Sequence, residues 1–198
     1  MGIKELCKDY EKGLIVLVCI ILWIVVYFAT NMASKGRATH SLPQVISSLP
    51  FAPEFVLVYF SCFFLVLMPY FFVKGKENFR KVAYSYIAVV LISAAVYLLY
   101  PIEVMREKII SQGIFHKMVA WLYAIDYPYN SFPSLHVGLS VLAALSCYKF
   151  NKKASLIFGF WAVLIAVSTL FIRQHYFLDI IGGALLAVVV FWFYQKRC

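Results

Sequence analysis

Acidic residues are scarce in this 198-residue chain, which has 9 Asp and Glu residues against 18 Lys and Arg residues. Charged residues of both signs make up only 14% of the sequence, whereas 64% is hydrophobic and the mean hydropathy is +0.85. Soluble domains have an apolar fraction nearer to about one half. The composition therefore excludes an ordinary soluble domain and indicates a membrane protein.

Cysteines are few, and their spacing suits neither a metal site nor a cross-link. They lie inside hydrophobic runs or at ends that we expect to face the cytoplasm, and the chain also lacks internal repeats and low-complexity tracts. We therefore expect no disulfide, no zinc or other metal, and no cofactor. The five cysteines are Cys7, Cys19, Cys62, Cys147 and Cys198.

Six hydrophobic runs reach or approach the length of about 20 residues that a helix needs to cross the bilayer core. They take up more than half of the chain and leave no room for a separate soluble domain. The prediction is an all-α polytopic membrane protein, with residues 1–198 forming one membrane-embedded domain built as a six-transmembrane-helix bundle. The runs are residues 14–30, 55–73, 82–100, 133–150, 154–172 and 176–194.

The basic residues predict the orientation, because cytoplasmic loops collect Lys and Arg. With the amino terminus inside, 12 of the 18 basic residues face the cytoplasm and 6 face outward. Both termini are then cytoplasmic and the 101–133 connection is outside, in what we expect to be a bacterial inner (plasma) membrane. Cleavage of the first run as a secretory signal is an open alternative. Topology and anionic headgroups explain the net charge of +9, so we expect no nucleic-acid partner.

Ionisable residues at the ends of membrane spans are candidates for function, because a charge in hydrocarbon is costly. Under the predicted topology, Arg106, His136, His175 and Asp179 all lie at the outer membrane surface. His175 and Asp179 are four residues apart, so on a helix the carboxylate is able to orient one ring nitrogen of the histidine. Each feature alone is more often an ordinary interfacial contact, but their combination at one depth indicates a site.

Two histidines, a carboxylate and a cation suit phosphoryl transfer through a covalent intermediate. One imidazole attacks phosphorus, the other protonates the leaving oxygen, and a guanidinium holds the phosphate. A serine hydrolase with Ser134 or Ser131 as nucleophile is an alternative, but the G-x-S-x-G motif is missing. Pro133 and Ser134 also predict a helix start just before His136, where free N–H groups favour an anion.

The segments NSFPSLHVG and QHYFLDIIGG resemble the second and third motifs of the type 2 phosphatidic acid phosphatase superfamily. The likeness extends to its branch near the inositol phosphorylceramide and sphingomyelin synthases. Pro133, Ser134 and His136 match the middle motif Pro-Ser-Gly-His, with Leu135 in the glycine position. The resemblance covers most of residues 55–198.

The resemblance implies a role for each matching residue. His175 is the nucleophile, Asp179 is its orienting partner, and His136 is the general acid that protonates the leaving group. Arg106 and Ser134 bind phosphate. The resemblance adds no metal and no cofactor to this set.

The chain departs from the family pattern at three positions that surround the site. Leu99 stands in the place of the first-motif lysine, Glu107 in the place of the proline after the arginine, and Thr169 in the place of the third-motif arginine. Two phosphate-binding cations are therefore missing from their expected positions. We expect Arg173 or Lys108 to substitute for them.

The activity implied by the resemblance is that of an integral membrane lipid phosphatase. It would hydrolyse a lipid or polyprenyl phosphate through a phosphohistidine at an extracytoplasmic site, with the lipid phosphate and the bilayer as its partners. The missing cations favour the synthase-like branch, a lipid phosphotransferase with the same His-His-Asp site. A non-enzymatic transporter or scaffold with this fold is a further alternative, weakened because both histidines and the aspartate are present.

The segment EKIISQGIFHKMVAWLYAI lies between the third and fourth runs and carries apolar residues at three- and four-residue steps. This pattern predicts an amphipathic helix in the membrane interface, which either roofs the site and guides lipid entry or only rests on the headgroups. We expect Asp126 and Asn130 to shape the loop that follows it, and Gly182 and Gly183 to permit close helix approach.

Overall fold

The computed structural model describes residues 3–38 and 49–196, with side chains described over 10–38 and 49–194. Within these ranges the chain is helical and contains no β-strand, which confirms the all-α prediction. The elements are α1 (Ile3–Ser34), the 3-10 helix η1 (Pro53–Phe55), α2 (Val56–Phe60), α3 (Cys62–Phe72), α4 (Lys76–Leu99), α5 (Ile114–Ile125), α6 (Leu135–Cys147), α7 (Lys152–Phe171) and α8 (Phe177–Lys196). The expectations for Cys7 and Cys198 lie outside the described side chains.

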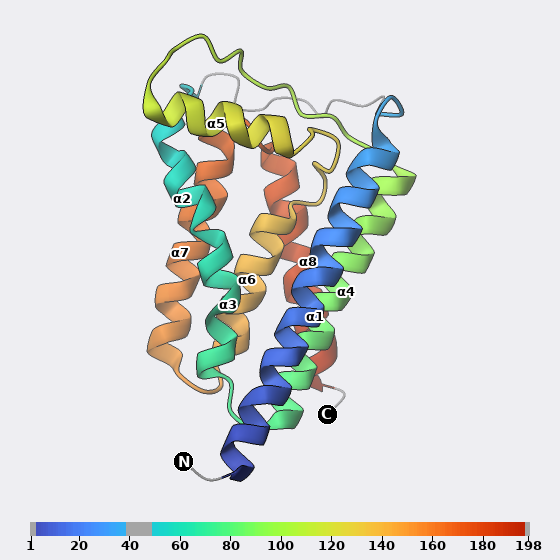
Figure 1. The fold of residues 1–198 in the computed structure, drawn as a ribbon, viewed down its shortest axis with the longest axis vertical. Helices are drawn as coiled ribbons and strands as arrows, with labels where there is room; N and C mark the ends of the chain where they lie inside the picture. Colours follow the sequence, from blue (N-terminus) through green and yellow to red (C-terminus); the bar gives the residue numbers. More distant parts are fainter. Residues whose placement is uncertain (1–2, 39–48, 197–198) are drawn as a thin grey trace.

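Five helical stretches in the described part of the chain are long and apolar enough to cross a membrane. They are residues 10–34, 53–72, 76–99, 152–171 and 177–194, and they correspond to five of the six predicted runs. The helix of the 53–72 span is interrupted at Ser61. η1, α2 and α3 therefore follow one another as consecutive pieces of one span (Figure 1).

The remaining predicted run, residues 133–150, forms the shorter helix α6 of 13 residues. α6 ends at Cys147, where the chain turns toward α7. The side chain of Asn151 caps the start of α7 by accepting a hydrogen bond from the N–H of Ala154 at 2.9 Å. A helix of this length rises about 20 Å, less than the roughly 30 Å of the hydrocarbon core. Figure 1 shows α6 inside the bundle, beside α3, α7 and α8.

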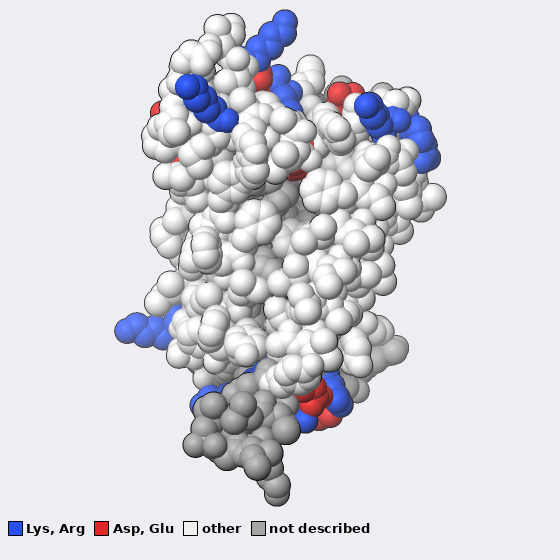
Figure 2. All heavy atoms as spheres, in the orientation of Figure 1, with Lys and Arg blue, Asp and Glu red and all other residues white. Residues whose placement is uncertain are grey.

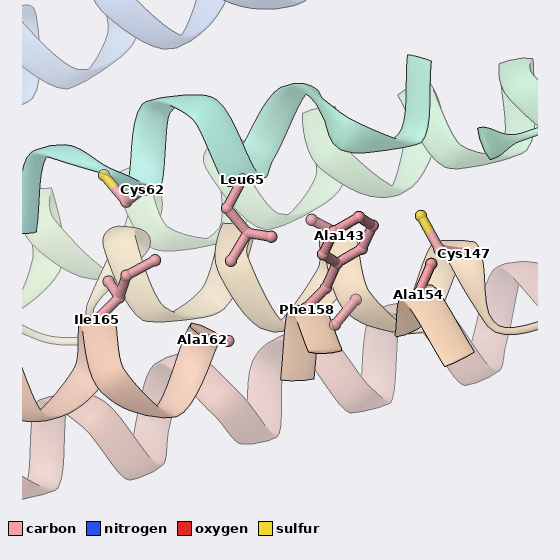
Figure 3. Close-up of a cluster of buried hydrophobic side chains, with 9 residues drawn as sticks. Cys62, Leu65, Ala143, Cys147, Ala154, Phe158, Ala162 and Ile165 are labelled. Atoms are coloured by element: carbon pink, nitrogen blue, oxygen red, sulfur yellow. The ribbon is translucent and has the colours of Figure 1, made fainter. Parts of the chain in front are cut away.

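An apolar cluster locks α6 between α3 and α7. Small side chains on α6 and α7 let the helices approach one another, and Leu65 and Phe158 fill the space between them (Figure 3). The buried members are Cys62, Leu65, Ala143, Ala144, Cys147, Ala154, Phe158, Ala162 and Ile165. This packing fixes α6 from the side opposite to α8.

α6 and α8 approach closely at Gly138 of α6 and Gly183 of α8. A Cβ atom at Gly183 would collide with the carbonyl oxygen of Ser134, and one at Gly138 would lie 3.1 Å from the carbonyl oxygen of Gly183. A side chain at Gly182 would meet the ring of Phe132. The prediction of close helix approach is confirmed for Gly183, which brings the start of α6 against the second turn of α8, whereas Gly182 faces the ring of Phe132 before α6.

Charged side chains gather toward the two ends of the bundle, with an uncharged band between them (Figure 2). We call one the α5 end, because α5 lies across it where α4 ends and α6 and α8 begin (Figure 1). The other, the opposite end, carries exposed ion pairs in which Glu11 meets Lys76 and Arg80. All four residues that the polar-residue argument singled out lie at the α5 end.

Candidate active site

His136 is held in the first turn of α6 by the cap that the sequence predicts. Ser134 is the N-cap residue, and its hydroxyl oxygen accepts a hydrogen bond from the N–H of Val137 at 3.4 Å. The backbone N–H of Ser134 donates to the carbonyl oxygen of Asp179 at 3.0 Å, which ties this turn to α8. His136 is buried as a result, although it sits at the end of a helix.

His175 lies in the short turn between α7 and α8, and Asp179 lies in the first turn of α8. The Oδ2 atom of Asp179 accepts the backbone N–H of Tyr176 at 2.7 Å and the hydroxyl of Ser131, so this carboxylate caps the start of α8. Nδ1 of His175 lies 3.4 Å from the same oxygen. The four-residue spacing therefore does place the carboxylate beside one ring nitrogen, and Asp179 is fully buried.

The two histidine rings face each other, His175 through Nε2 and His136 through Nδ1. Nδ1 of His136 lies 3.4 Å from Nε2 of His175, and the ring centroids are 5.7 Å apart. On the far side of His136, the hydroxyl of Tyr59 lies 2.8 Å from Nε2. Asp179, His175, His136 and Tyr59 thus form a row of buried polar groups that comes from α8, the turn before it, α6 and α2.

Arg106 is fixed beside this row by four contacts. Its Nη1 atom donates to the carbonyl oxygens of Asp126, at 2.5 Å, and Tyr123, at 3.2 Å, while Nη2 donates to Oε1 of Gln174 at 2.7 Å. The guanidinium also stacks 4.5 Å from the centre of the Tyr123 ring. A flexible side chain in the 101–113 connection is thereby held in one place.

A small cavity lies between Arg106 and His175. Four polar atoms on its lining residues are buried and have no hydrogen-bond partner among the residues that the structure describes: Nε of Arg106, Nε2 of Gln174, Nδ1 of His175 and Oδ1 of Asn130. The atoms of Arg106 and Gln174 are donors, which suits an anion. The cavity is lined by Tyr27, Arg106, Asp126, Tyr127, Pro128, Asn130, Ser131, Gln174 and His175.

The other three predicted phosphate ligands, Ser134, Arg173 and Lys108, do not line this cavity. Arg173 has a φ of 52°, and its guanidinium donates to the carbonyl oxygen of Leu49 at 2.7 Å. Lys108 is exposed in the connection before α5. Neither residue lines the cavity, although Arg173 is only two positions from His175.

Asp126 and Asn130 connect the site to α1. The carboxylate of Asp126 accepts hydrogen bonds from the hydroxyl of Tyr27 at 2.7 Å and the amide of Asn31 at 3.2 Å. The amide of Asn130 donates to Thr30 at 2.9 Å. Burial raises the pKa of Asp126, and the positive charge of Arg106 opposes this rise. The expected role of these two residues in shaping the loop agrees with this network.

The geometry argues against the alternative of a serine nucleophile. The hydroxyl of Ser131 donates to Asp179 and that of Ser134 accepts from a backbone N–H, so neither has a histidine as its partner. A serine nucleophile requires an adjacent general base.

Across residues 10–38 and 49–194, no group of three or more His, Cys, Asp or Glu side chains is placed to hold a metal ion.

Two residues of the site, Gln174 and Tyr59, went unassigned in the sequence, and Ser131 was considered only as a serine nucleophile. Ser131 and Gln174 lie within the segments that carry the motifs, so a polar residue in such a segment was their available signal. Tyr59 lies in the apolar run 55–73, where nothing distinguishes it from its aromatic neighbours.

With its long apolar helices, the fold is that of a polytopic integral membrane protein. A family model of the PAP2 superfamily matches residues 47–193, and the chain belongs to this superfamily. The resemblance seen in the motifs around His136 and His175 is thereby confirmed. α1 lies before the matched region.

Curated relatives match about a third of the chain. The inositol phosphorylceramide synthase catalytic subunit of Schizosaccharomyces pombe is 34% identical over 68 residues, 34% of this chain and 16% of that protein. The inositol phosphorylceramide synthase of Candida albicans is 36% identical over 69 residues, 35% of this chain and 15% of that protein. A PA-phosphatase related-family protein of Dictyostelium discoideum is 38% identical over 63 residues, 32% of this chain and 11% of that protein.

The matched segments thus span about a sixth or less of the length of these relatives. No solved structure matches the chain significantly. The family is established by the motif-bearing region, and the activity of the whole protein is a matter for proposal.

Proposed function

We propose that the protein is a membrane enzyme that breaks the phosphate ester of a lipid through a phosphohistidine on His175. The observation that carries this proposal is the row in which Nε2 of His175 faces Nδ1 of His136 while Nδ1 of His175 faces Asp179. A carboxylate beside one nitrogen orients the ring and leaves the other nitrogen free to attack.

In the proposed mechanism the two histidines act on opposite sides of the scissile bond. Nε2 of His175 attacks phosphorus, the bond to the leaving oxygen breaks, and His136 gives that oxygen a proton. Asp179 stabilises the charge that develops on His175. In the second step His136 takes a proton from the acceptor that attacks the phosphohistidine, which is water in a phosphatase.

The phosphate is proposed to bind where unpartnered donors face the cavity. Arg106 supplies the positive charge, and Nε2 of Gln174 supplies a neutral donor that takes over part of the work of the missing family cations. The hydroxyl proton of Ser134 is also available to an anion, since its oxygen accepts but does not donate in the α6 cap. Arg173 and Lys108 remain predicted ligands, and the lining of the cavity favours Gln174 over them.

The proposed membrane arrangement has residues 1–198 as one domain with six crossings, α6 being a short one surrounded by other helices. α5 would lie in the outer interface, because it is amphipathic and crosses the bundle at the site end (Figure 1). The bias of basic residues supports cytoplasmic termini and an outward-facing site. A lipid phosphate reaches such a site with its headgroup while its chains stay in hydrocarbon.

A second candidate is a lipid phosphotransferase, in which an alcohol rather than water attacks the phosphohistidine. The observation that favours it is that two of the relatives are named inositol phosphorylceramide synthases. The same two histidines and the aspartate serve either acceptor.

One experiment tests both candidates. The purified protein is incubated with a mixed lipid extract, and mass spectrometry follows dephosphorylated lipids and exchanged headgroups. Dephosphorylated products indicate hydrolysis, and new headgroup combinations indicate transfer. Lipids that bind without any turnover would contradict both and revive a non-enzymatic role.

A further inference from the structure

The hydroxyl of Tyr59 is an unassigned polar group in the middle of an apolar helix. Tyr59 is 1% exposed, and its hydroxyl lies 2.8 Å from Nε2 of His136. Among the residues that the structure describes, this hydroxyl has no other hydrogen-bond partner. Burying an unpaired hydroxyl costs free energy, so this contact is what makes a tyrosine acceptable here.

The contact decides which nitrogen of His136 faces the reaction. Because Tyr59 occupies Nε2, the nitrogen left to face the nucleophile is Nδ1, which lies 3.4 Å from Nε2 of His175. Nε2 carries a proton both in the charged ring and in the neutral ring that has given up the proton of Nδ1, so in both states the hydroxyl oxygen of Tyr59 accepts from Nε2. The tyrosine therefore holds the same ring orientation in both protonation states of His136.

We propose that Tyr59 is a positioning residue for proton transfer, which acts by holding Nε2 of His136 so that Nδ1 delivers the proton. This inference rests on the proposed phosphohistidine mechanism. Tyr59 itself does not touch the phosphate; its effect passes through His136.

Before the proton transfer His136 is positively charged, with one proton on Nδ1 and one on Nε2. The bond between phosphorus and the leaving oxygen breaks, its electron pair goes to that oxygen, and the oxygen takes the proton from Nδ1. The pair of the broken N–H bond stays on Nδ1, and His136 becomes neutral with its remaining proton on Nε2, toward the oxygen of Tyr59. Nδ1 is then ready to accept a proton from water or an alcohol in the second step.

Tyr59→Phe is the direct test, because it removes the hydroxyl and keeps the ring that packs 4.7 Å from the imidazole. Two probes are compared: phosphatidic acid in detergent micelles, whose leaving alkoxide needs a proton, and 4-nitrophenyl phosphate, whose leaving group does not. We expect kcat for phosphatidic acid to fall about 10- to 100-fold, part of what a general acid contributes. The rate with 4-nitrophenyl phosphate and the KM for both should stay near the wild-type values.

A matched control is Tyr86→Phe, which removes a hydroxyl that donates to the carbonyl oxygen of Val66 at 3.1 Å. It should leave the ratio of the two rates unchanged. An equal loss with both probes in Tyr59→Phe, or full activity with both, would overturn the positioning role while leaving the proposed function intact. A wild-type protein that cleaves neither probe would overturn both.

Nitrogen-15 spectra of histidine-labelled protein give a readout that needs no turnover. We expect Tyr59→Phe to shift the Nε2 signal of His136 and to leave the signals of His116 unchanged. An unmoved His136 signal would contradict the contact itself.

Discussion

The two ends of the bundle use ionisable side chains in opposite ways. At the α5 end Asp179 is fully buried and Asp126 and His175 are each 7% exposed, and these side chains lie among hydrogen-bonding groups from several helices. At the opposite end the side chains of Glu11 and Arg80 form an ion pair while 28% and 46% exposed. Exposed pairs contribute little to stability, whereas a buried charge is costly unless its partners are in place. The comparison teaches that position and burial, not residue type, distinguish the charges of the candidate site.

The largest effect is expected at the proposed nucleophile. His175→Ala should lower turnover of the lipid substrate on the order of 10⁴-fold or more, as is typical when a nucleophile is removed. The measurement is phosphate or product release by the purified variant, with its thermal midpoint showing that it is folded. His116→Ala, at a half-buried histidine on α5, is the matched control. Full activity in the His175 variant would show that the buried ionisable residues of the α5 end do not include the nucleophile.

A smaller loss is expected at the carboxylate behind the nucleophile. Asp179→Asn keeps the size of the side chain and removes the charge that faces Nδ1 of His175. We expect kcat to fall about 10²- to 10⁴-fold, since a misoriented or wrongly protonated imidazole attacks slowly. Glu103→Gln, at an exposed acid of the same end, should change kcat little. Equal effects of the two changes would mean that burial does not distinguish functional acids here.

The two ends are compared directly by replacing one arginine at each. Arg106→Lys keeps the charge and loses the planar fork that reaches Gln174 and two carbonyl oxygens. A hydrogen bond to a charged group contributes about 1.5–3 kcal/mol, so losing one to the phosphate of the substrate should raise KM about 10- to 100-fold. Arg80→Lys at the opposite end should leave KM unchanged. Steady-state kinetics with the lipid substrate decides between these outcomes.

The smallest effect concerns packing at the α5 end. Gly183→Ala places a methyl group against the carbonyl oxygen of Ser134 and should destabilise the protein by about 1–3 kcal/mol. Gly159→Ala on α7 is the control, because a Cβ there meets nothing within 4 Å. Thermal unfolding in detergent measures both. A midpoint for Gly183→Ala as high as that of the control would show that α6 and α8 have room to separate.

The sequence was informative where polar residues interrupt apolar runs. His136, His175 and Asp179 stand out on this ground, and their motifs led to the correct family. Tyr59 gave no such signal, because it is one of 14 tyrosines and lies in a span rich in aromatic residues. Only the contact of its hydroxyl with His136 selects it, and such a contact between distant segments is not encoded in local spacing.

Chain direction explains the difference between Arg173 and Gln174. Both neighbour His175 in the sequence, and the positive charge made Arg173 the natural candidate. The left-handed turn at Arg173 sends its side chain to Leu49, while Gln174 is buried beside Arg106. Hydropathy likewise located α6 but not its length, because α6 ends at Cys147 while the predicted apolar run continues to residue 150.

A single carboxylate oxygen, Oδ2 of Asp179, receives the N–H that starts α8 and also faces His175. Initiation of a helix and alignment of the proposed nucleophile are therefore one structural event. Evolution cannot adjust them separately: a substitution that improves the helix start at the expense of this oxygen also changes the catalyst. Position 179 should accordingly tolerate fewer replacements in a deep mutational scan than either role alone would impose.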